Sequence, residues 1–270
     1  MAKKTISAAR KTKIGPAKLP RKGAAKPPAK AAKSGPKTPK SKALKPNSLK
    51  PWSADEVREA FERFSKASPE PRGELEHLNP YTLVVAVALS AQATDAGVNK
   101  ATRALFPVAD TPQKMAALGE ERLRDYIKTV GLFRTKAKNV IALSERLIAE
   151  HGGEVPNSRE ALEALPGVGR KTANVVLNIA FGEPTIAVDT HLFRVGNRTG
   201  LAPGKTPLEV ELGLDRVIPA EFKRHAHHWL ILHGRYTCIA RRPLCQKCII
   251  NDLCRWPEKM VALEPPRAKG

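Results

Sequence analysis

Apolar residues recur at helical spacing along most of the chain after Pro51, and Gly and Pro interrupt this pattern at short intervals. The spacing predicts a first helix that begins at 54–58, with Ser53 as its N-cap. Further helices are expected over residues 81–91, 96–106, 111–118, 120–130, 135–151, 158–164, 171–181, 190–197, 207–217 and 222–236. No stretch alternates apolar and polar residues as a strand would, and no segment is repeated. We therefore expect an all-α fold.

The first 50 residues differ sharply from the rest in composition. They hold 16 of the 47 Lys and Arg residues and no acid, so the other 220 residues carry 31 basic against 26 acidic side chains. Seven prolines exclude a continuous helix, and the few apolar residues predict a disordered arm. Such an arm binds phosphate backbones without reading base sequence. A solubility tail or an organelle address is the alternative.

Several protein classes are excluded by the absence of their sequence signals. The longest apolar run, residues 83–91, is much shorter than the roughly 18–20 residues that span a bilayer and fits a buried helix. The N-terminus lacks an apolar stretch with a cleavage site, so secretion is not expected. We expect a cytoplasmic protein associated with the nucleoid in a bacterium, or a nuclear or mitochondrial one in a eukaryote.

Residues 158–181, SREALEALPGVGRKTANVVLNIAF, predict two short helices joined by a tight turn. Pro166 must end the first helix, and Gly167 and Gly169 allow the turn and a close approach of the backbone to a ligand. The second helix begins near Arg170, where its free N–H groups form an anion site suited to a DNA phosphate. This is the helix–hairpin–helix pattern.

Lys171 lies in the first turn of the second helix, opposite the apolar stripe of that helix. One interpretation is a lysine that contacts phosphate or solvent. The other is a nucleophile, since the positive end of the helix dipole and partial burial lower the pKa of an amine, and a neutral amine forms Schiff bases. Asp189 precedes the next helical stretch, where it could serve as an N-cap, as a catalytic carboxylate near Lys171, or as both.

The four cysteines of the chain lie close together, as C-x6-C-x2-C-x5-C. Four thiolates suit tetrahedral zinc or a [4Fe–4S] cluster, and the presence of one C-x2-C pair instead of two slightly favours iron–sulfur. The proposed ligands are Cys238, Cys245, Cys248 and Cys254. Arg241, Arg242 and Lys247 lie in or beside the intervening loop, so the metal site is expected to brace a contact with the DNA backbone.

Four histidines, His225, His227, His228 and His233, share one helical segment with Trp229. They could form a second metal site, but no paired carboxylate accompanies them. Core packing and hydrogen bonding between helices are the favoured interpretation.

The stretches LPGVGRKTANVVLNIAFGEPTIAVDTHLFRVGNRTG and HHWLILHGRYTCIARRPLCQKCIINDLC closely resemble the endonuclease III family, bifunctional DNA glycosylase/AP lyases of base-excision repair. The similarity runs from about residue 79 to 254 and leaves the arm outside. It implies removal of oxidised pyrimidines from duplex DNA, followed by strand cleavage through β-elimination. It also implies a [4Fe–4S] cluster, with Lys171 as the Schiff-base lysine and Asp189 as the catalytic aspartate.

The same resemblance implies roles for residues near the DNA. In LSAQATD, Gln92 matches the residue that fills the hole left by the extruded base, and Ser90 and Asp95 match polar groups near the pocket. In VGLFRTKA, Leu132 matches the wedge pressed into the opposite strand. The expected partner is double-stranded DNA with damaged bases or abasic sites. We expect a monomer with no membrane association.

The resemblance further implies two helical domains with a DNA-binding cleft between them. We expect a six-helix bundle with the hairpin over residues 73–183, a cluster domain from 51–72 and 184–260, and a flexible tail over 261–270. Lys171 and Asp189 would face each other across the cleft.

Four other functions compete with this interpretation. An adenine-specific mismatch glycosylase lacks the lysine nucleophile, but a pyrimidine-dimer glycosylase would keep both Lys171 and Asp189. A DNA-binding module without activity leaves that pair unexplained. An electron-transfer protein explains the cysteines alone.

Overall fold

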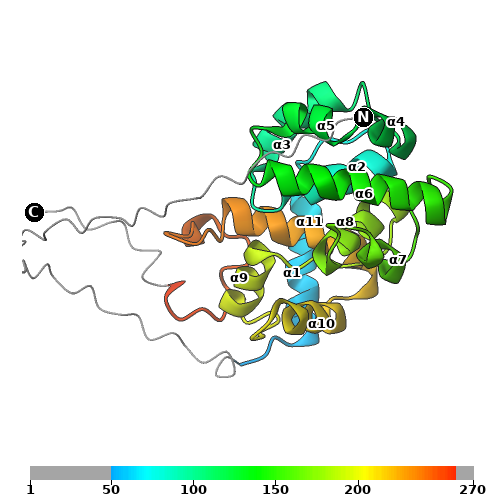
Figure 1. Cartoon of the computed structure of the whole chain (residues 1–270). Coiled ribbons are helices and arrows are strands. Elements are labelled where there is room, and N and C mark those ends of the chain that lie inside the picture. Colours follow the sequence, from blue (N-terminus) through cyan, green and yellow to red (C-terminus); the bar gives the residue numbers. More distant parts are fainter. Residues whose placement is uncertain (1–49, 260–270) are drawn as a thin grey trace, which may run out of the picture. The chain divides into compact units, whose positions relative to one another are not determined.

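The computed structural model describes residues 50–259, which belong to one compact unit. These residues form helices and no strand, so the predicted all-α fold is confirmed (Figure 1). The helices are α1 Ala54–Ala67, α2 Pro80–Ser90, α3 Asp95–Leu105, α4 Pro112–Leu118, α5 Glu120–Ile127, α6 Phe133–His151, α7 Arg159–Ala164, α8 Arg170–Phe181, α9 Thr190–Thr199, α10 Pro207–Val217, α11 Ala220–Tyr236 and the 3₁₀ turn η2 Cys245–Lys247. The predicted arm, except for Lys50, and the predicted tail lie outside the described residues.

Side-chain caps explain why most helices begin where they do. The predicted N-cap Ser53 accepts a hydrogen bond from the amide of Glu56, and the Glu56 carboxylate accepts one from the amide of Ser53. Asn79 caps α2 in the same reciprocal way with Thr82, and single N-cap side chains, Thr94 and Ser158, begin α3 and α7. The chain therefore encodes its helix starts locally.

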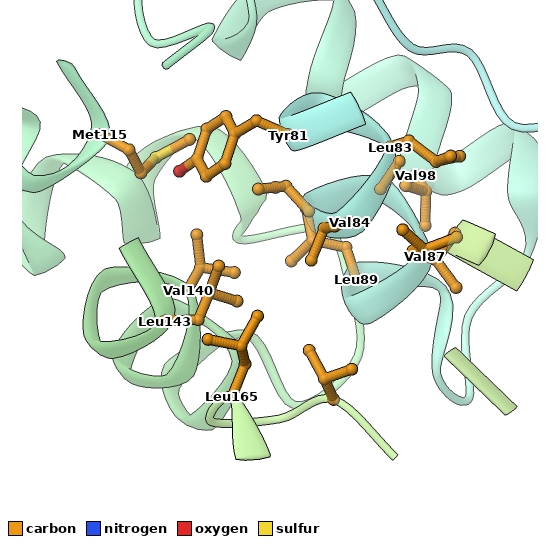
Figure 2. Packing of buried hydrophobic residues seen from close by; sticks show 14 of the residues in the cluster. Tyr81, Leu83, Val84, Val87, Leu89, Val98, Met115, Val140, Leu143 and Leu165 are labelled. Atoms are coloured by element: carbon orange, nitrogen blue, oxygen red, sulfur yellow. The ribbon is translucent and has the colours of Figure 1, made fainter. Parts of the chain in front are cut away.

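One hydrophobic core is built around α2, which is buried on all sides. Every residue of α2 from Tyr81 to Leu89 is buried. Figure 2 shows Tyr81 and Val84 of this helix near Val140 and Leu143 of α6. Because water reaches no face of α2, its sequence is apolar all round, as expected for the central helix of a bundle.

A second core combines the first helix of the described chain with the last ones. Phe61 of α1 packs against Trp229 of α11, and Leu192 of α9 lies in the same cluster. The indole N–H of Trp52 donates to the carbonyl of Thr199, which further ties the start of the body to α9. The two cores follow the predicted two-part architecture, whereas the residue boundaries between domains stay a prediction. None of the helices between residues 50 and 259 has the length and apolar character needed to cross a membrane.

Candidate functional site

The hairpin between α7 and α8 has the predicted geometry. α7 ends at Ala164, and Gly167 follows in the left-handed region with φ +78°. A Cβ atom at Gly167 would lie 3.0 Å from Asn139, so a larger residue would be both strained and crowded. Gly169 is the N-cap of α8 and supplies no side-chain cap, and a Cβ atom there would meet nothing within 4 Å. The first N–H groups of α8 therefore face an open approach suited to an anion.

The guanidinium of Arg170 is held by another helix. It donates to the Glu211 carboxylate of α10 from Nη2 at 2.7 Å and from Nε at 3.1 Å. This ion pair joins the hairpin to the second core. The backbone amide of Arg170 lies in the first turn of α8, among the N–H groups suited to a phosphate.

A cavity of about 690 Å³ lies beside the hairpin and is lined by residues of both halves of the fold. α8 contributes Lys171, and the N-cap of α9 contributes Asp189. The end of α2 and the loop after it contribute Ser90 and Gln92, and the start of α3 contributes Asp95. Five predicted site residues from three separate stretches of sequence thus share one cavity.

The surroundings of Lys171 lower the pKa of its amine below that of an ordinary lysine. Burial lowers the pKa of its amine, and this effect exceeds the opposite influence of the carboxylates of Asp189 and Asp95, while Arg235 lowers the pKa further. Burial, one of the two causes that the sequence pattern suggested, therefore lowers the pKa of this amine. Within residues 50–259 no ion pair joins Lys171 to Asp189. The two side chains therefore share the cavity without neutralising each other's charge.

Asp189 is the N-cap of α9, as one of its two predicted roles required. A single carboxylate oxygen, Oδ1, accepts from the amide of His191 at 2.8 Å and from the amide of Leu192 at 2.9 Å. These bonds fix the orientation of the carboxyl group toward the cavity and leave Oδ2 for chemistry.

The face of α8 that carries Lys171 is covered by protein on the C-terminal side of the first turn. Asn174 and Asn178 are buried, because residues 183–187 pack along this face. The Asn174 amide donates to the carbonyl of Ile186 at 3.3 Å, and the Asn178 amide donates to the carbonyls of Glu183 and Thr185 at 3.0 and 3.2 Å. The two asparagines thereby hold the segment that leads to Asp189 against the helix that carries Lys171. The sequence pattern placed them opposite the apolar stripe but missed this role.

Arg235 of α11 is a second residue that the sequence pattern did not identify. Its Nη1 donates to the Asp95 carboxylate at 2.5 Å and also pairs with Glu74. Arg235 belongs to the C-terminal helices, whereas Glu74 precedes α2 and Asp95 begins α3. These pairs therefore connect the two halves of the fold beside the cavity.

Three residues other than glycine have left-handed backbone conformations within residues 50–259. They are Gln92 at φ +55°, Leu132 at φ +59° and Arg242 at φ +54°. Each was predicted to contact DNA. Leu132 is 62% exposed despite being apolar, and Arg241, Arg242 and Lys247 are exposed too. Backbone strain of this kind costs about 1–3 kcal/mol per residue and persists where the surrounding structure imposes it.

The four cysteines line one small cavity and form no disulfide. Burial raises the pKa of Cys248 to about 12 and also raises the pKa of Cys245 and Cys254, so these thiols need a cation in order to ionise. Arg198 Nη1 lies 3.6 Å from Cys238 Sγ, and the amide of Trp256 lies 3.5 Å from Cys254 Sγ. Four thiols with N–H donors directed at the sulfurs fit an iron–sulfur cluster.

The histidines of α11 lie in two places. His233 is buried in the second core, where its ring meets Phe64 edge-on at 5.4 Å. His225, His227 and His228 line the cavity that holds Lys171, and the last two are buried.

Comparison with known proteins identifies close relatives. A family model described as HhH-GPD superfamily base excision DNA repair protein matches residues 85–220, and the iron–sulfur binding domain of endonuclease III matches residues 238–254. Endonuclease III of Haemophilus influenzae is 61% identical over 202 residues, which are 75% of this chain and 96% of the relative. Endonuclease III of Escherichia coli strain K12 is 60% identical over the same length and shares.

Solved structures show the same relationship. A trapped covalent intermediate of endonuclease III with DNA, an estranged-adenine complex, matches with a TM-score of 0.72 and 45% identity, over 77% of this chain and 99% of the other. A non-covalent endonuclease III–DNA complex matches with a TM-score of 0.73 and 45% identity, over 77% and 98%.

Proposed function

Because the chain belongs to the endonuclease III family, we propose that Lys171 and Asp189 carry out the two reactions of that family in the cavity described above. The protein is a base-excision-repair DNA glycosylase for oxidised pyrimidines in duplex DNA, with an associated AP lyase activity. The observation that carries the assignment of residues is one cavity that holds an amine with a lowered pKa and, from a different helix, an oriented carboxylate.

The reaction begins when the damaged nucleotide leaves the base stack, which costs a few kcal/mol and less for a damaged base. By resemblance, Gln92 fills the space left in the duplex and Leu132 enters the opposite strand. The exposed, strained conformations of these two residues support such a role. The nucleotide then reaches the cavity between the two halves of the fold.

Bond breaking follows from the properties of Lys171. Its neutral amine attacks C1′ of the deoxyribose, a C–N bond to the enzyme forms, and the glycosidic bond breaks as the base leaves with the bonding electrons and takes up a proton from solvent. Asp189 accepts a proton from the attacking amine, stabilises the positive charge that develops on the sugar, and then donates that proton to O4′ as the C1′–O4′ bond breaks. The nitrogen lone pair forms the C=N bond of an iminium, which acidifies the C2′ proton, and removal of that proton by a base expels the 3′ phosphate by β-elimination. Water then releases the lysine.

The [4Fe–4S] cluster of the family is held by Cys238, Cys245, Cys248 and Cys254. When bound, it would cross-link the C-terminal loop through these four thiolates. We infer that the rigid loop presents Arg241, Arg242 and Lys247 to the DNA backbone, which their exposure supports.

The choice of lesion is tested with duplexes that each contain one modified base. Thymine glycol should be excised and the strand cleaved, and a cyclobutane pyrimidine dimer should remain intact. Cleavage of the dimer with no cleavage of thymine glycol would instead assign the site to pyrimidine-dimer repair.

Loss of one cluster ligand should destabilise the second core. In Cys248→Ala we expect loss of bound iron and a thermal unfolding midpoint lower by at least about 5 °C, because cluster binding is coupled to folding. Iron content and calorimetry measure both. Ile249→Ala is the matched control, since Ile249 is the next residue in the loop and is 39% exposed. A stable, iron-free Cys248→Ala protein would contradict a bracing role for the cluster.

Removal of residues 1–49 should weaken binding to undamaged duplex DNA and flatten its dependence on salt. The segment carries 15 basic residues and no acid, and each phosphate contact contributes about −0.9 to the slope of log K against log salt. Titrations at several salt concentrations measure the effect, and discrimination between lesion and normal DNA should persist. An arm of shuffled sequence should behave like the native one; equal slopes with and without the arm would exclude a tether. We infer that in a bacterium the arm keeps the enzyme at the nucleoid.

A further inference from the structure

Lys136 is a buried lysine whose side chain bonds two backbone carbonyls. It lies in the first turn of α6 and is 7% exposed. Its Nζ donates to the carbonyl of Leu89 at 2.8 Å and to that of Ala91 at 2.6 Å. Burial lowers the pKa of this amine, and no acidic group among the described residues offsets that effect. Burying a cation without a carboxylate partner costs folding free energy. The position of Lys136 therefore calls for an explanation, which its bonds to the two carbonyls suggest.

The two carbonyls belong to the C-terminal end of α2. The last carbonyls of a helix have no partners within the helix, and a cation there is favoured by the helix dipole. Ala91 is the C-cap of α2, and the next residue is Gln92 with its left-handed backbone. Lys136 therefore fixes the point at which the chain leaves α2 and turns into the Gln92 conformation.

The backbone of Lys136 is hydrogen-bonded to Leu132, the second residue with a left-handed backbone near Lys136. Its amide donates to the carbonyl of Leu132 at 3.1 Å, and Leu132 is the N-cap of α6 in the left-handed region. The two loops also lie close together, since a Cβ atom built on Gly131 would be 3.5 Å from the carbonyl oxygen of Gln92. Lys136 thus bonds the backbone at Ala91, just before Gln92, through its side chain, and the backbone at Leu132 through its amide.

We propose that Lys136 is a positioning residue for base extrusion, which holds the Gln92 and Leu132 loops at a fixed separation so that both side chains enter the duplex together. The proposal rests on the proposed function, in which Gln92 fills the vacated space and Leu132 is the wedge. Lys136 does not line the cavity that holds Lys171 and Asp189. Its loss should therefore affect substrates that require extrusion and spare those that do not.

The test compares Lys136→Met with wild type on two substrates under single-turnover conditions. On a duplex with one thymine glycol, we expect the rate to fall by about tenfold, because misplaced loops penalise extrusion. On a single-stranded oligonucleotide with an abasic site, where no base is extruded, we expect a change of less than about twofold. Lys138→Met, an exposed lysine two residues along the same helix, is the control and should match wild type on both.

A double-mutant cycle separates positioning from general damage to the fold. In a Gln92→Ala/Leu132→Ala background, adding Lys136→Met should lower the thymine glycol rate by less than about twofold, since the side chains that it positions are already gone. Equal losses on both substrates, or the full tenfold loss in this background, would overturn the proposal. If Lys136→Met does not fold, Lys136→Gln is used, which keeps a donor for one of the two carbonyls; its loss should be smaller than tenfold but still confined to the thymine glycol duplex, and equal losses on both substrates would overturn the proposal. Wild-type cleavage of the thymine glycol duplex independently tests the proposed function.

Discussion

Replacement of Lys171 by Met is expected to lower strand incision at an abasic site by at least about 10³-fold, because it removes the nucleophile. Lys171 is the one lysine among the described residues that line the cavity, so no neighbouring amine there can substitute for it. Methionine keeps an unbranched stem, which preserves packing in the first turn of α8. Single-turnover incision of an abasic duplex gives the rate.

Binding should respond differently from incision in the same variant. The free amides at the start of α8 and the exposed basic residues remain, so affinity for an abasic duplex should change by less than about threefold. Lys100→Met, an exposed lysine on α3, is the matched control for loss of one positive charge. Incision by Lys171→Met at a rate close to that of wild type would show that another group is the nucleophile.

Replacement of Asp189 by Asn is expected to reduce turnover by about 10²–10³-fold with little change in stability. Asparagine accepts the same two amide hydrogen bonds as an N-cap, so α9 should keep its start and the free energy of unfolding should fall by only a few tenths of a kcal/mol. The negative charge is lost, however, and with it proton acceptance and stabilisation of the sugar cation. Denaturant unfolding and single-turnover kinetics measure the two effects.

Asp189→Ala separates the capping role from the catalytic role. It should lose the same activity and, in addition, about 1 kcal/mol of stability, because the amides of His191 and Leu192 lose their acceptor. If Asp189→Asn keeps wild-type activity while Asp189→Ala loses stability, Asp189 is an N-cap with no part in the chemistry.

Helix positions could be predicted closely because their signals are local. The helix over residues 207–217 begins and ends as predicted, since Thr206 caps it and Pro207 suits its first position. The largest difference at a helix end is in α5, which was expected to reach residue 130 and ends at Ile127. After Ile127 the chain turns toward Gly131 and Leu132, which has a left-handed backbone. Tertiary structure imposes this conformation, so the spacing of apolar residues did not predict where α5 ends.

The site could be predicted in part, for different reasons at different residues. The Gly-rich turn identified Lys171, and the resemblance to a family supplied the roles of Gln92 and Leu132. Lys136 and Arg235 were missed because a buried or paired cation has the same sequence signature as a solvated one. The ion pair of Arg170 with Glu211 was also missed, because Glu211 is 41 residues away and only the fold brings the two together.

Reduction with borohydride during turnover tests most directly that an uncharged lysine amine becomes bonded to deoxyribose. Peptide mapping of the adduct should locate the DNA on Lys171, and adduct formation should rise with pH and level off below the ordinary lysine pKa of 10.5, since burial lowers the pKa of this amine. Absence of an adduct, or its attachment to a different residue, would contradict the assignment.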